Sequence, residues 1–225
     1  MSSKRFFDLA FCFLLAPVWV PALIFSSCAV LLFSGLPIFY VSNRRVFGKQ
    51  SARVWKLRTM VRDAEKIANR TTIPVTEQRF LNIDLQSPLY TGVGRIIERF
   101  NLTELPQFMH VLAGSMHVIG NRPLPEDVVE TLVAEFPDAE DRFAIRCGLT
   151  GPVQLIGRQH ISDVERLMLE TTYARSCLEN YVLWLDIMLA FNTVLVLLGV
   201  RRGFTVNELS SAMRRWGVSV PLPGG

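Results

Sequence analysis

The stretch NLTELPQFMHVLAGSMHVIGNRPLP, from Asn101 to Pro125, decides how the chain is interpreted. Thr103 or Asn101 is expected to cap a helix, since each side-chain oxygen accepts from a backbone N–H of the first turn. Pro106 favours Thr103, because a missing N–H costs little in a first helical turn. Gly114 is expected to end the helix. Apolar residues recur between them at helical spacing, at Leu105, Phe108, Val111 and Leu112.

The second half of this stretch is expected to form a short extended segment and then a stiff loop. Met116–Ile119 is apolar, Gly120-Asn121 is a turn signal, and Arg122 follows directly before a proline. Glu104 would lie at a helix N-terminus, where the helix dipole favours an anion. A carboxylate, an arginine and a helix N-terminus together suit a phosphate and a metal ion. The alternative is purely structural, a capped helix followed by an ordinary turn.

Upstream, an apolar stretch from Phe6 to Tyr40 predicts membrane attachment. Asp8 is its only formally charged residue. As one straight helix the stretch would reach roughly 50 Å, against a hydrocarbon core of roughly 30 Å. Pro17 and Pro21 are expected to break or kink such a helix.

Basic residues flank the apolar stretch on both sides, Lys4 and Arg5 before it and Arg44 and Arg45 after it. Positive charge on both flanks favours a re-entrant helix whose two ends lie on the cytoplasmic side. A single membrane span is the alternative. A cleaved signal peptide is disfavoured, because the stretch is too long and has no clear small-residue cleavage site.

The composition fits one domain with a membrane element. The chain has 225 residues, of which 50% are hydrophobic, a net charge of +4 and a mean hydropathy of +0.28. A basic, apolar chain points to an anionic membrane face or a phosphate-bearing substrate. Nucleic acid is disfavoured, because no finger, basic helix or aromatic-rich binding signature is present. The four cysteines have no paired spacing, which argues against disulfides and zinc and fits a reducing compartment.

The expected fold class is α+β and mostly helical. It comprises a re-entrant membrane-anchoring helix over residues 1–42, a compact cytoplasmic domain over 43–215 with a small β-hairpin and interfacial helices, and a flexible tail over 216–225. Five basic residues form either an electropositive platform or a solvated face: Arg44, Arg45, Arg53, Lys56 and Arg58. Local patterns predict that Gly35–Tyr40 and Ala52–Leu57 form a β-hairpin or a pair of extended arms. They also predict a helix that opens at Asp63–Glu65, a loop over 69–90, a helix over Glu126–Phe136, and a helix over Asp163–Glu179 that Ser162 caps.

Several motifs together resemble the bacterial sugar transferases called monotopic phosphoglycosyl transferases. Leu102–Gln107 resembles the family's L-D-E-L-P-Q, and the two segments Gly114–His117 and Gly120–Pro123 resemble G-D-M-S and G-P-R-P. Further matches are Lys56–Met60 with K-F-R-[ST]-M, Thr91–Arg95 with T-x-x-G-R, and Arg146–Gln154 with R-P-G-I-T-G-x-x-Q. The resemblance implies that the apolar segment Tyr181–Val200, with Asp186 and Thr193, is an interfacial or packed helix; a membrane span is the alternative.

The resemblance implies transfer of a sugar-1-phosphate from a nucleotide diphosphate sugar to polyprenyl phosphate, which initiates exopolysaccharide, lipopolysaccharide or glycoconjugate synthesis. It implies a Mg²⁺ cofactor and a location at the cytoplasmic face of the bacterial inner membrane, among its lipids, with a homodimer as an option. Carried over by motif, Glu104 and Thr103 occupy catalytic positions and Glu104 the metal position. The expected phosphate-binding residues are Arg122, Arg95, Lys56 and Arg58.

The sequence departs from the family pattern at the nucleophile, where Thr103 replaces an aspartate. Five residues earlier Glu98 replaces an arginine, and Ser115, His117, Asn121, Cys147 and Ala16 also differ. A threonine hydroxyl needs a base to attack, and adjacent Glu104 is not expected to face it. We therefore expect no covalent intermediate; transfer would use Glu104 or direct attack by the lipid phosphate. The alternatives are an impaired paralogue that binds substrate or a partner transferase, and a membrane-bound structural protein.

Overall fold

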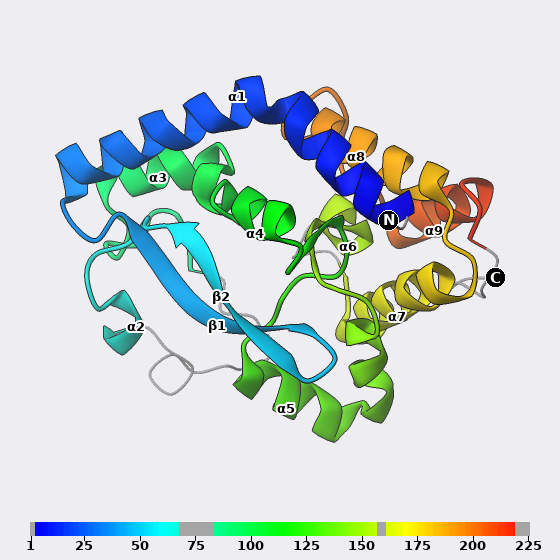
Figure 1. Cartoon of the computed structure of the whole chain (residues 1–225). Coiled ribbons are helices and arrows are strands. Elements are labelled where there is room, and N and C mark those ends of the chain that lie inside the picture. The colour runs from blue at the N-terminus through cyan, green and yellow to red at the C-terminus, as the bar shows by residue number, and fades with distance from the viewer. Residues whose placement is uncertain (1–2, 68–82, 157–160, 219–225) are drawn as a thin grey trace. The chain divides into compact units, whose positions relative to one another are not determined.

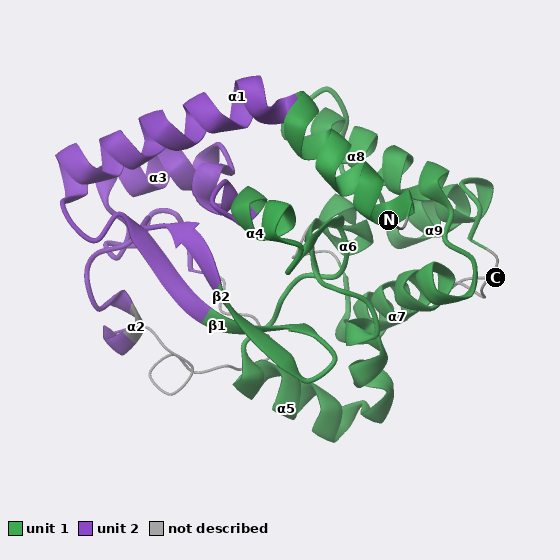
Figure 2. Cartoon of the chain, in the orientation of Figure 1, with its two compact units in different colours: residues 1–14, 43–53, 108–225 green, residues 15–42, 54–107 purple. Residues whose placement is uncertain are grey.

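A computed structural model describes residues 3–67, 83–156 and 161–218, and the predicted mostly helical class is confirmed (Figure 1). The chain divides into two compact units (Figure 2). Unit 1 comprises Met1–Leu14, Asn43–Arg53 and Phe108–Gly225, and unit 2 comprises Leu15–Ser42 and Val54–Gln107. Both units are therefore discontinuous in sequence, and the N-terminal helix contributes to each.

The elements follow one another along the chain with these bounds. The first part holds α1 Ser3–Ser34, β1 Phe39–Phe47, β2 Gln50–Leu57, α2 Ala64–Ile67, α3 Gly92–Arg99, the 3-10 turn η1 Leu102–Glu104 and α4 Gln107–Ala113. The second part holds β3 His117–Ile119, α5 Glu126–Glu135, the 3-10 helix η2 Pro137–Phe143, β4 Gly148–Thr150, α6 Pro152–Ile156, α7 Asp163–Glu179, α8 Leu183–Leu197 and α9 Val206–Arg215.

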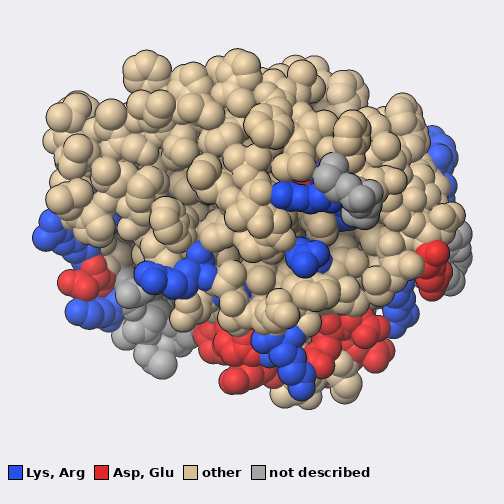
Figure 3. Space-filling model, viewed as in Figure 1, with Lys and Arg blue, Asp and Glu red and all other residues tan. Residues whose placement is uncertain are grey.

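Helix α1 continues through both of its prolines. Pro17 and Pro21 lie inside the 32-residue helix, so of the predicted break or kink the break is wrong. Within the described residues, α1 is the helix that is long and apolar enough to cross a membrane. The surface at the top of Figure 3, where α1 lies, shows no Lys, Arg, Asp or Glu side chains. The exposed side chains of α1 include Phe13 and Phe25.

The predicted hairpin is confirmed, but three of its four strand boundaries differ. Strand β1 extends from Phe39 to Phe47 rather than from Gly35 to Tyr40, and β2 begins at Gln50 rather than Ala52. Gly48, at a φ of 49°, opens the turn into β2. The left-handed backbone there suits glycine and explains why the chain reverses at this point.

The central stretch begins differently from the prediction. Residues Leu102–Glu104 form a 3-10 turn, and the α-helix starts only at Gln107. Thr103 lies inside that turn, so its predicted role as a helix cap is wrong, and Glu104 does not lie at an α-helix N-terminus. Gly114 follows α4 at a φ of 79°, which confirms it as the end of the helix.

Unit 1 is built around a short parallel pairing of β3 and β4. His117 pairs with Gly148, and Ile119 with Thr150. A Cβ on Gly148 would lie 2.1 Å from the backbone nitrogen of Gly120, so only glycine permits this approach. The buried side chains of Leu155, Leu169, Leu185, Leu189 and Leu209 complete the core, in which α6 contacts α7, α8 and α9.

Local signals placed two helices of unit 1 correctly. Helix α5 agrees with the predicted range to within one residue. Helix α7 begins at Asp163 after the predicted cap Ser162, whose side chain forms a reciprocal capping box with Glu165. The predicted loop over 69–90 lies largely outside the described residues. The predicted tail over 216–225 does so from residue 219 onward.

Helix α8 has one packed face and one exposed face. Leu185, Asp186, Leu189, Ala190 and Asn192 are buried, whereas Trp184 and Phe191 are exposed. Its 15 residues span about 22 Å, less than the roughly 30 Å of a hydrocarbon core. The prediction of a packed helix is therefore confirmed for the buried face of α8.

Unit 2 has a small core of Val30, Leu57 and Ile97, drawn from α1, β2 and α3. Thr91 caps α3, because its hydroxyl accepts from the Gly94 N–H at 3.0 Å. A Cβ on Gly94 would lie 1.8 Å from the Thr59 carbonyl oxygen. Gly94 thus permits a close approach of backbone to backbone.

Candidate functional site

Lys56 and Glu104 form an ion pair in unit 2. Lys56 Nζ, from β2, lies 3.0 Å from Glu104 Oε1, from η1. Their side chains are 21% and 25% exposed, so the pair is shielded but reachable from solvent. The structure therefore brings together a predicted phosphate ligand and the predicted second acid of the motif.

Thr103 is paired with a residue that sequence reasoning had noted only as a departure. Its hydroxyl Oγ1 donates to Glu98 Oε2 at 2.7 Å. Asn101 lies between them at a φ of 55° and turns the chain back, so that η1 returns to the last turn of α3. Glu98 thus provides a carboxylate that can accept the proton of the Thr103 hydroxyl.

Arg58 and Arg95 hold main-chain oxygens in unit 2. Arg58 is buried, and its guanidinium donates to the carbonyls of Ser34 and Gly35 at 2.5 and 2.6 Å, just where α1 ends. Burial, and then Arg62, lower the pKa of Arg58. Arg95 donates to the carbonyls of Leu85 and Ser87. Phosphate binding by these two arginines stays a prediction.

Arg122 belongs to unit 1, where a buried ion pair supports its main chain. Arg142 donates to both carboxylate oxygens of Glu170, at 2.7 and 2.8 Å, and also to the Arg122 carbonyl at 3.1 Å. Burial alone lowers the pKa of Arg142, but the Glu170 charge and hydrogen bonds raise it, and the net shift is upward. Arg142 thus stays charged and fixes the loop that carries Arg122.

Three departures from the family pattern have structural explanations in unit 1. The Asn121 amide Nδ2 donates to the carbonyls of Arg142 and Glu170, each at 2.9 Å. Ser115 Oγ donates to the His110 carbonyl at 3.2 Å. Cys147 is fully buried, and burial raises the pKa of its thiol to about 12, so it is no thiolate nucleophile.

The first turns of α1 are anchored in unit 1 by charged side chains. Lys4 Nζ lies 2.6 Å from Asp186 Oδ2 and 2.9 Å from the Tyr173 hydroxyl. Asp8 is fully buried; its Oδ2 lies 2.6 Å from His117 Nδ1, and its Oδ1 accepts from the Val118 N–H. Sequence reasoning missed these pairs, although a lone acid in an apolar stretch signals a partner.

The donor set of unit 2 fits magnesium held jointly with a substrate. Among the described residues no group of three or more His, Cys, Asp or Glu side chains forms a metal cage. Mg²⁺ is usually bound by one or two carboxylates together with substrate phosphates and water. The carboxylate of Glu104, partly exposed beside Lys56, matches that requirement.

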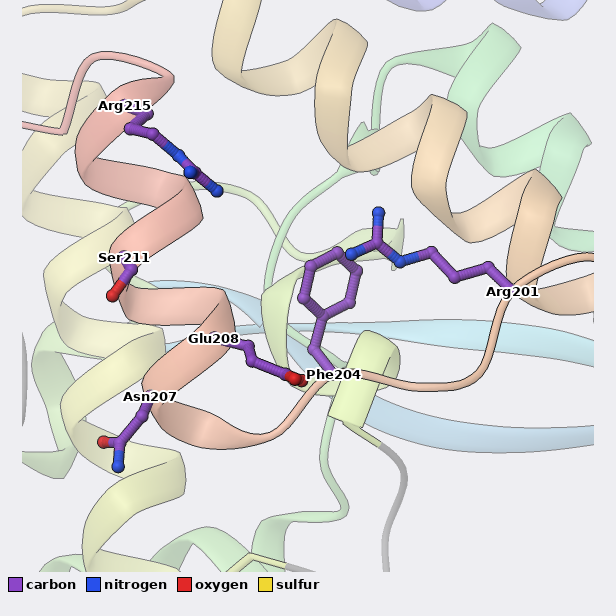
Figure 4. A pocket seen from close by; sticks show the side chains of 6 residues that line it. All are labelled: Arg201, Phe204, Asn207, Glu208, Ser211 and Arg215. Carbon is purple, nitrogen blue, oxygen red and sulfur yellow. The ribbon is translucent and has the colours of Figure 1, made fainter.

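A separate hollow of about 410 Å³ lies beside α9 in unit 1 (Figure 4). The Arg201 guanidinium stacks 3.9 Å from the Phe204 ring centroid and donates to Asn192 Oδ1. Arg202 is paired with Glu208 at the same helix start. None of the predicted site residues lines this hollow, which is formed by Arg201, Phe204, Asn207, Glu208, Ser211 and Arg215.

Comparison with known proteins identifies the family. The family model for bacterial sugar transferases matches residues 1–200. The chain is 27% identical to the UDP-N-acetylgalactosamine-undecaprenyl-phosphate N-acetylgalactosaminephosphotransferase of Aeromonas hydrophila, over 87% of this chain and 43% of that protein. It is 29% identical to the exopolysaccharide production protein ExoY of Rhizobium meliloti, over 85% and 84%.

A third relative is the UDP-glucose:undecaprenyl-phosphate glucose-1-phosphate transferase of Caulobacter vibrioides, which is 30% identical over 85% of this chain and 68% of that protein. The chain thus spans less than half of the Aeromonas relative but most of ExoY. The motifs that pointed to sugar transferases lie inside the matched region. The chain belongs to the bacterial sugar transferase family.

Proposed function

We propose that the protein transfers a sugar-1-phosphate from a UDP-sugar to a polyprenyl phosphate, in the synthesis of an exopolysaccharide or related glycan. The observation that carries this proposal is the cluster of Lys56, Glu98, Thr103 and Glu104, built on the motif segments of unit 2. The names of the relatives support it, since they specify UDP-sugars, undecaprenyl phosphate and exopolysaccharide. They do not favour an impaired, purely binding paralogue.

Each unit by itself offers a charged group that suits a phosphate of the donor. In unit 2, Lys56 supplies a cation beside Glu104. In unit 1, Arg122 supplies a fork-shaped donor on a loop held by Arg142. When bound, Mg²⁺ would neutralise the diphosphate and stabilise the leaving nucleoside monophosphate. Glu104 is the proposed ligand, and its pairing with Lys56 holds the carboxylate in place.

The direct test is release of UMP from a panel of UDP-sugars, with polyprenyl phosphate and Mg²⁺ each present or omitted. We expect release with at least one sugar when lipid and metal are both present, together with a lipid-linked sugar diphosphate. Removal of Mg²⁺ by a chelator is expected to stop the reaction. Binding of UDP-sugar without release across the panel would instead favour the impaired paralogue.

Replacing Arg122 with alanine is expected to weaken UDP-sugar binding about 10- to 140-fold. The loss of charge-assisted hydrogen bonds typically costs about 1.5–3 kcal/mol, which converts to that change in Kd. Titration calorimetry with the preferred UDP-sugar measures it. Arg214→Ala, which removes an exposed arginine of α9, is the matched control and should bind like the wild type. Equal affinities for both variants would remove Arg122 from the site.

Membrane attachment without crossing is also proposed. Residues 1–14 and 43–53 both belong to unit 1, so the apolar segment between them leaves and re-enters the same compact unit. Lys4 and Asp8 fix one flank to unit 1, and Arg45, paired with Glu126 and Glu140, fixes the other. A folded unit lies on one side of a bilayer, so both flanks would lie on that side, the cytoplasmic one. The exposed face of α8 would then lie in the interface.

Cysteine labelling tests this topology. Ser3→Cys and Ser42→Cys, each in a background without the four native cysteines, are expected to resist a membrane-impermeant maleimide in intact spheroplasts. Both should react once the membrane is permeabilised. Labelling of either residue from outside would establish a spanning helix instead.

A further inference from the structure

The hydrogen bond between Glu98 and Thr103 places a carboxylate beside the position where the family has its nucleophile. The Thr103 hydroxyl donates to Glu98 Oε2 at 2.7 Å. Within the described parts of the chain, this hydroxyl is the only partner found for the Glu98 carboxylate. Glu98 is partly exposed, whereas Thr103 is only 9% exposed. Glu98, on α3, therefore places a carboxylate within one hydrogen bond of position 103, where the family has an aspartate.

The carboxylates of Glu98 and Glu104 differ in what holds them. Glu104 is ion-paired with Lys56 at 3.0 Å, and an ammonium group so close draws electron density away from a nucleophile. Glu98 is held by a neutral hydroxyl, through one oxygen, Oε2. Glu98 is thus the freer nucleophile, and Glu104 suits the metal and phosphate.

Thr103 itself is poorly suited to covalent transfer. Its hydroxyl must lose a proton before it attacks, whereas a carboxylate attacks with a lone pair that is already available. A sugar phosphate on threonine is an alkyl phosphodiester, whose alkoxide leaves poorly. A sugar phosphate on a carboxylate is a labile acyl phosphate, so the second half of the reaction can proceed.

We propose that Glu98 is the nucleophile of this enzyme and that Thr103 is its positioning residue. A lone pair of Glu98 Oε1 attacks the phosphorus that bears the sugar, and the P–O bond to the nucleoside monophosphate breaks with its electron pair on the leaving group. A polyprenyl phosphate oxygen then attacks the same phosphorus, and the bond to Glu98 breaks to return the carboxylate. This proposal rests on the proposed function and replaces our expectation that no covalent intermediate forms.

The sequence itself allows the intermediate to be located. Trypsin cuts after Arg95 and Arg99, so Glu98 falls in the peptide Ile96–Arg99, while Thr103 and Glu104 fall in the peptide that begins at Phe100. The full-length protein is mixed with its preferred UDP-sugar without lipid acceptor, quenched and treated with hydroxylamine. Hydroxylamine converts an acyl phosphate to a hydroxamate but leaves a threonine phosphodiester intact.

We expect a sugar-phosphate mass increase that hydroxylamine removes, with the hydroxamate on Ile96–Arg99. A hydroxylamine-resistant adduct on the Phe100 peptide would make Thr103 the nucleophile, and a hydroxamate on that peptide would make it Glu104. Turnover without any adduct would mean direct transfer. Each of these three results overturns the role of Glu98 and leaves the proposed function standing. Absence of UMP release even with lipid and Mg²⁺ would instead overturn the proposed function.

Variants supply an independent readout. Glu98→Gln can still accept from Thr103 but is no nucleophile, so kcat should fall on the order of 10⁴- to 10⁶-fold, the scale of removing a covalent nucleophile. Its UDP-sugar affinity should be retained, which shows that the site is folded. Glu130→Gln, an exposed acid on α5, is the matched control with unchanged turnover. Retained turnover in a folded Glu98→Gln protein overturns the proposal.

The positioning role of Thr103 has its own signature. Thr103→Val keeps the shape of the side chain but removes the donor, so kcat should fall while KM stays unchanged. Thr103→Ser keeps the hydroxyl and should restore kcat. A merely structural threonine would show the opposite ranking, because valine fills the buried space better than serine. Equal kcat for the valine variant and the wild type would remove Thr103 from this role.

Discussion

Replacing Glu170 with glutamine should lower the free energy of unfolding by about 3–5 kcal/mol, because the change leaves a buried guanidinium without its counter-charge. The Arg142 and Glu170 side chains are only 1% and 3% exposed. For a domain of this size the loss corresponds to a decrease in Tm of about 6–20 °C. Thermal unfolding in detergent micelles measures it.

The same substitution should also weaken UDP-sugar binding, because Arg142 holds the carbonyl of Arg122. Two controls separate burial from charge. Arg175→Ala breaks a half-exposed pair with Asp141 and should cost less than about 1 kcal/mol. The double variant Arg142→Met, Glu170→Met should recover most of the lost stability, since no buried charge remains. A Glu170→Gln protein as stable as Arg175→Ala would contradict the argument.

Replacing Asp186 with asparagine is the second large effect, again about 3–5 kcal/mol. Asp186 is fully buried and receives Lys4 Nζ at 2.6 Å, the Tyr173 hydroxyl at 2.6 Å and the Tyr181 hydroxyl at 2.9 Å. Burial, and then the Asp186 charge, raise the pKa of Tyr173 well above its ordinary value, so Tyr173 remains a donor. Asparagine carries no charge and cannot neutralise the Lys4 ammonium group, which Asp186 contacts directly.

Trypsin reports on the Asp186 prediction directly. In the wild type, Lys4 is buried, whereas loss of Asp186 should release the first turns of α1 and speed cleavage after Lys4 and Arg5. Adding Lys4→Met to Asp186→Asn removes the orphaned charge and should restore much of the stability. Unchanged thermal unfolding and proteolysis in the single variant would show that the pair does not anchor α1.

The elements that sequence reasoning placed correctly are those decided by neighbouring residues. Ser162 and Glu165 lie three positions apart and form reciprocal capping hydrogen bonds, so the start of α7 could be predicted from the sequence. The start of α4 could not, because the hydroxyl of Thr103 bonds to Glu98 on another element rather than to the backbone of its own helix. Local capping rules do not include such a competing tertiary partner.

The candidate site could be predicted only in part, because some of its contacts join elements that are distant in the sequence. The motifs named Lys56 and Glu104, and the structure pairs them. Glu98 was identified only as a mismatch, since nothing in a linear pattern reveals that Asn101 reverses the chain. The pairs that anchor α1 were out of reach, because 109 residues separate Asp8 from His117 and 182 separate Lys4 from Asp186.

The distance along the chain between Lys4 and Asp186 sets an order of events during synthesis. The 182 residues between them take about 10–40 s to translate at typical rates. Until that interval ends Lys4 lacks Asp186, although His117, the partner of Asp8, is synthesised earlier. Under the proposed membrane attachment, the nascent helix would reach the lipid surface before Lys4 pairs with Asp186. A chain whose synthesis stops before Asp186 would then remain at the membrane without this ion pair, and proteases would be expected to degrade it.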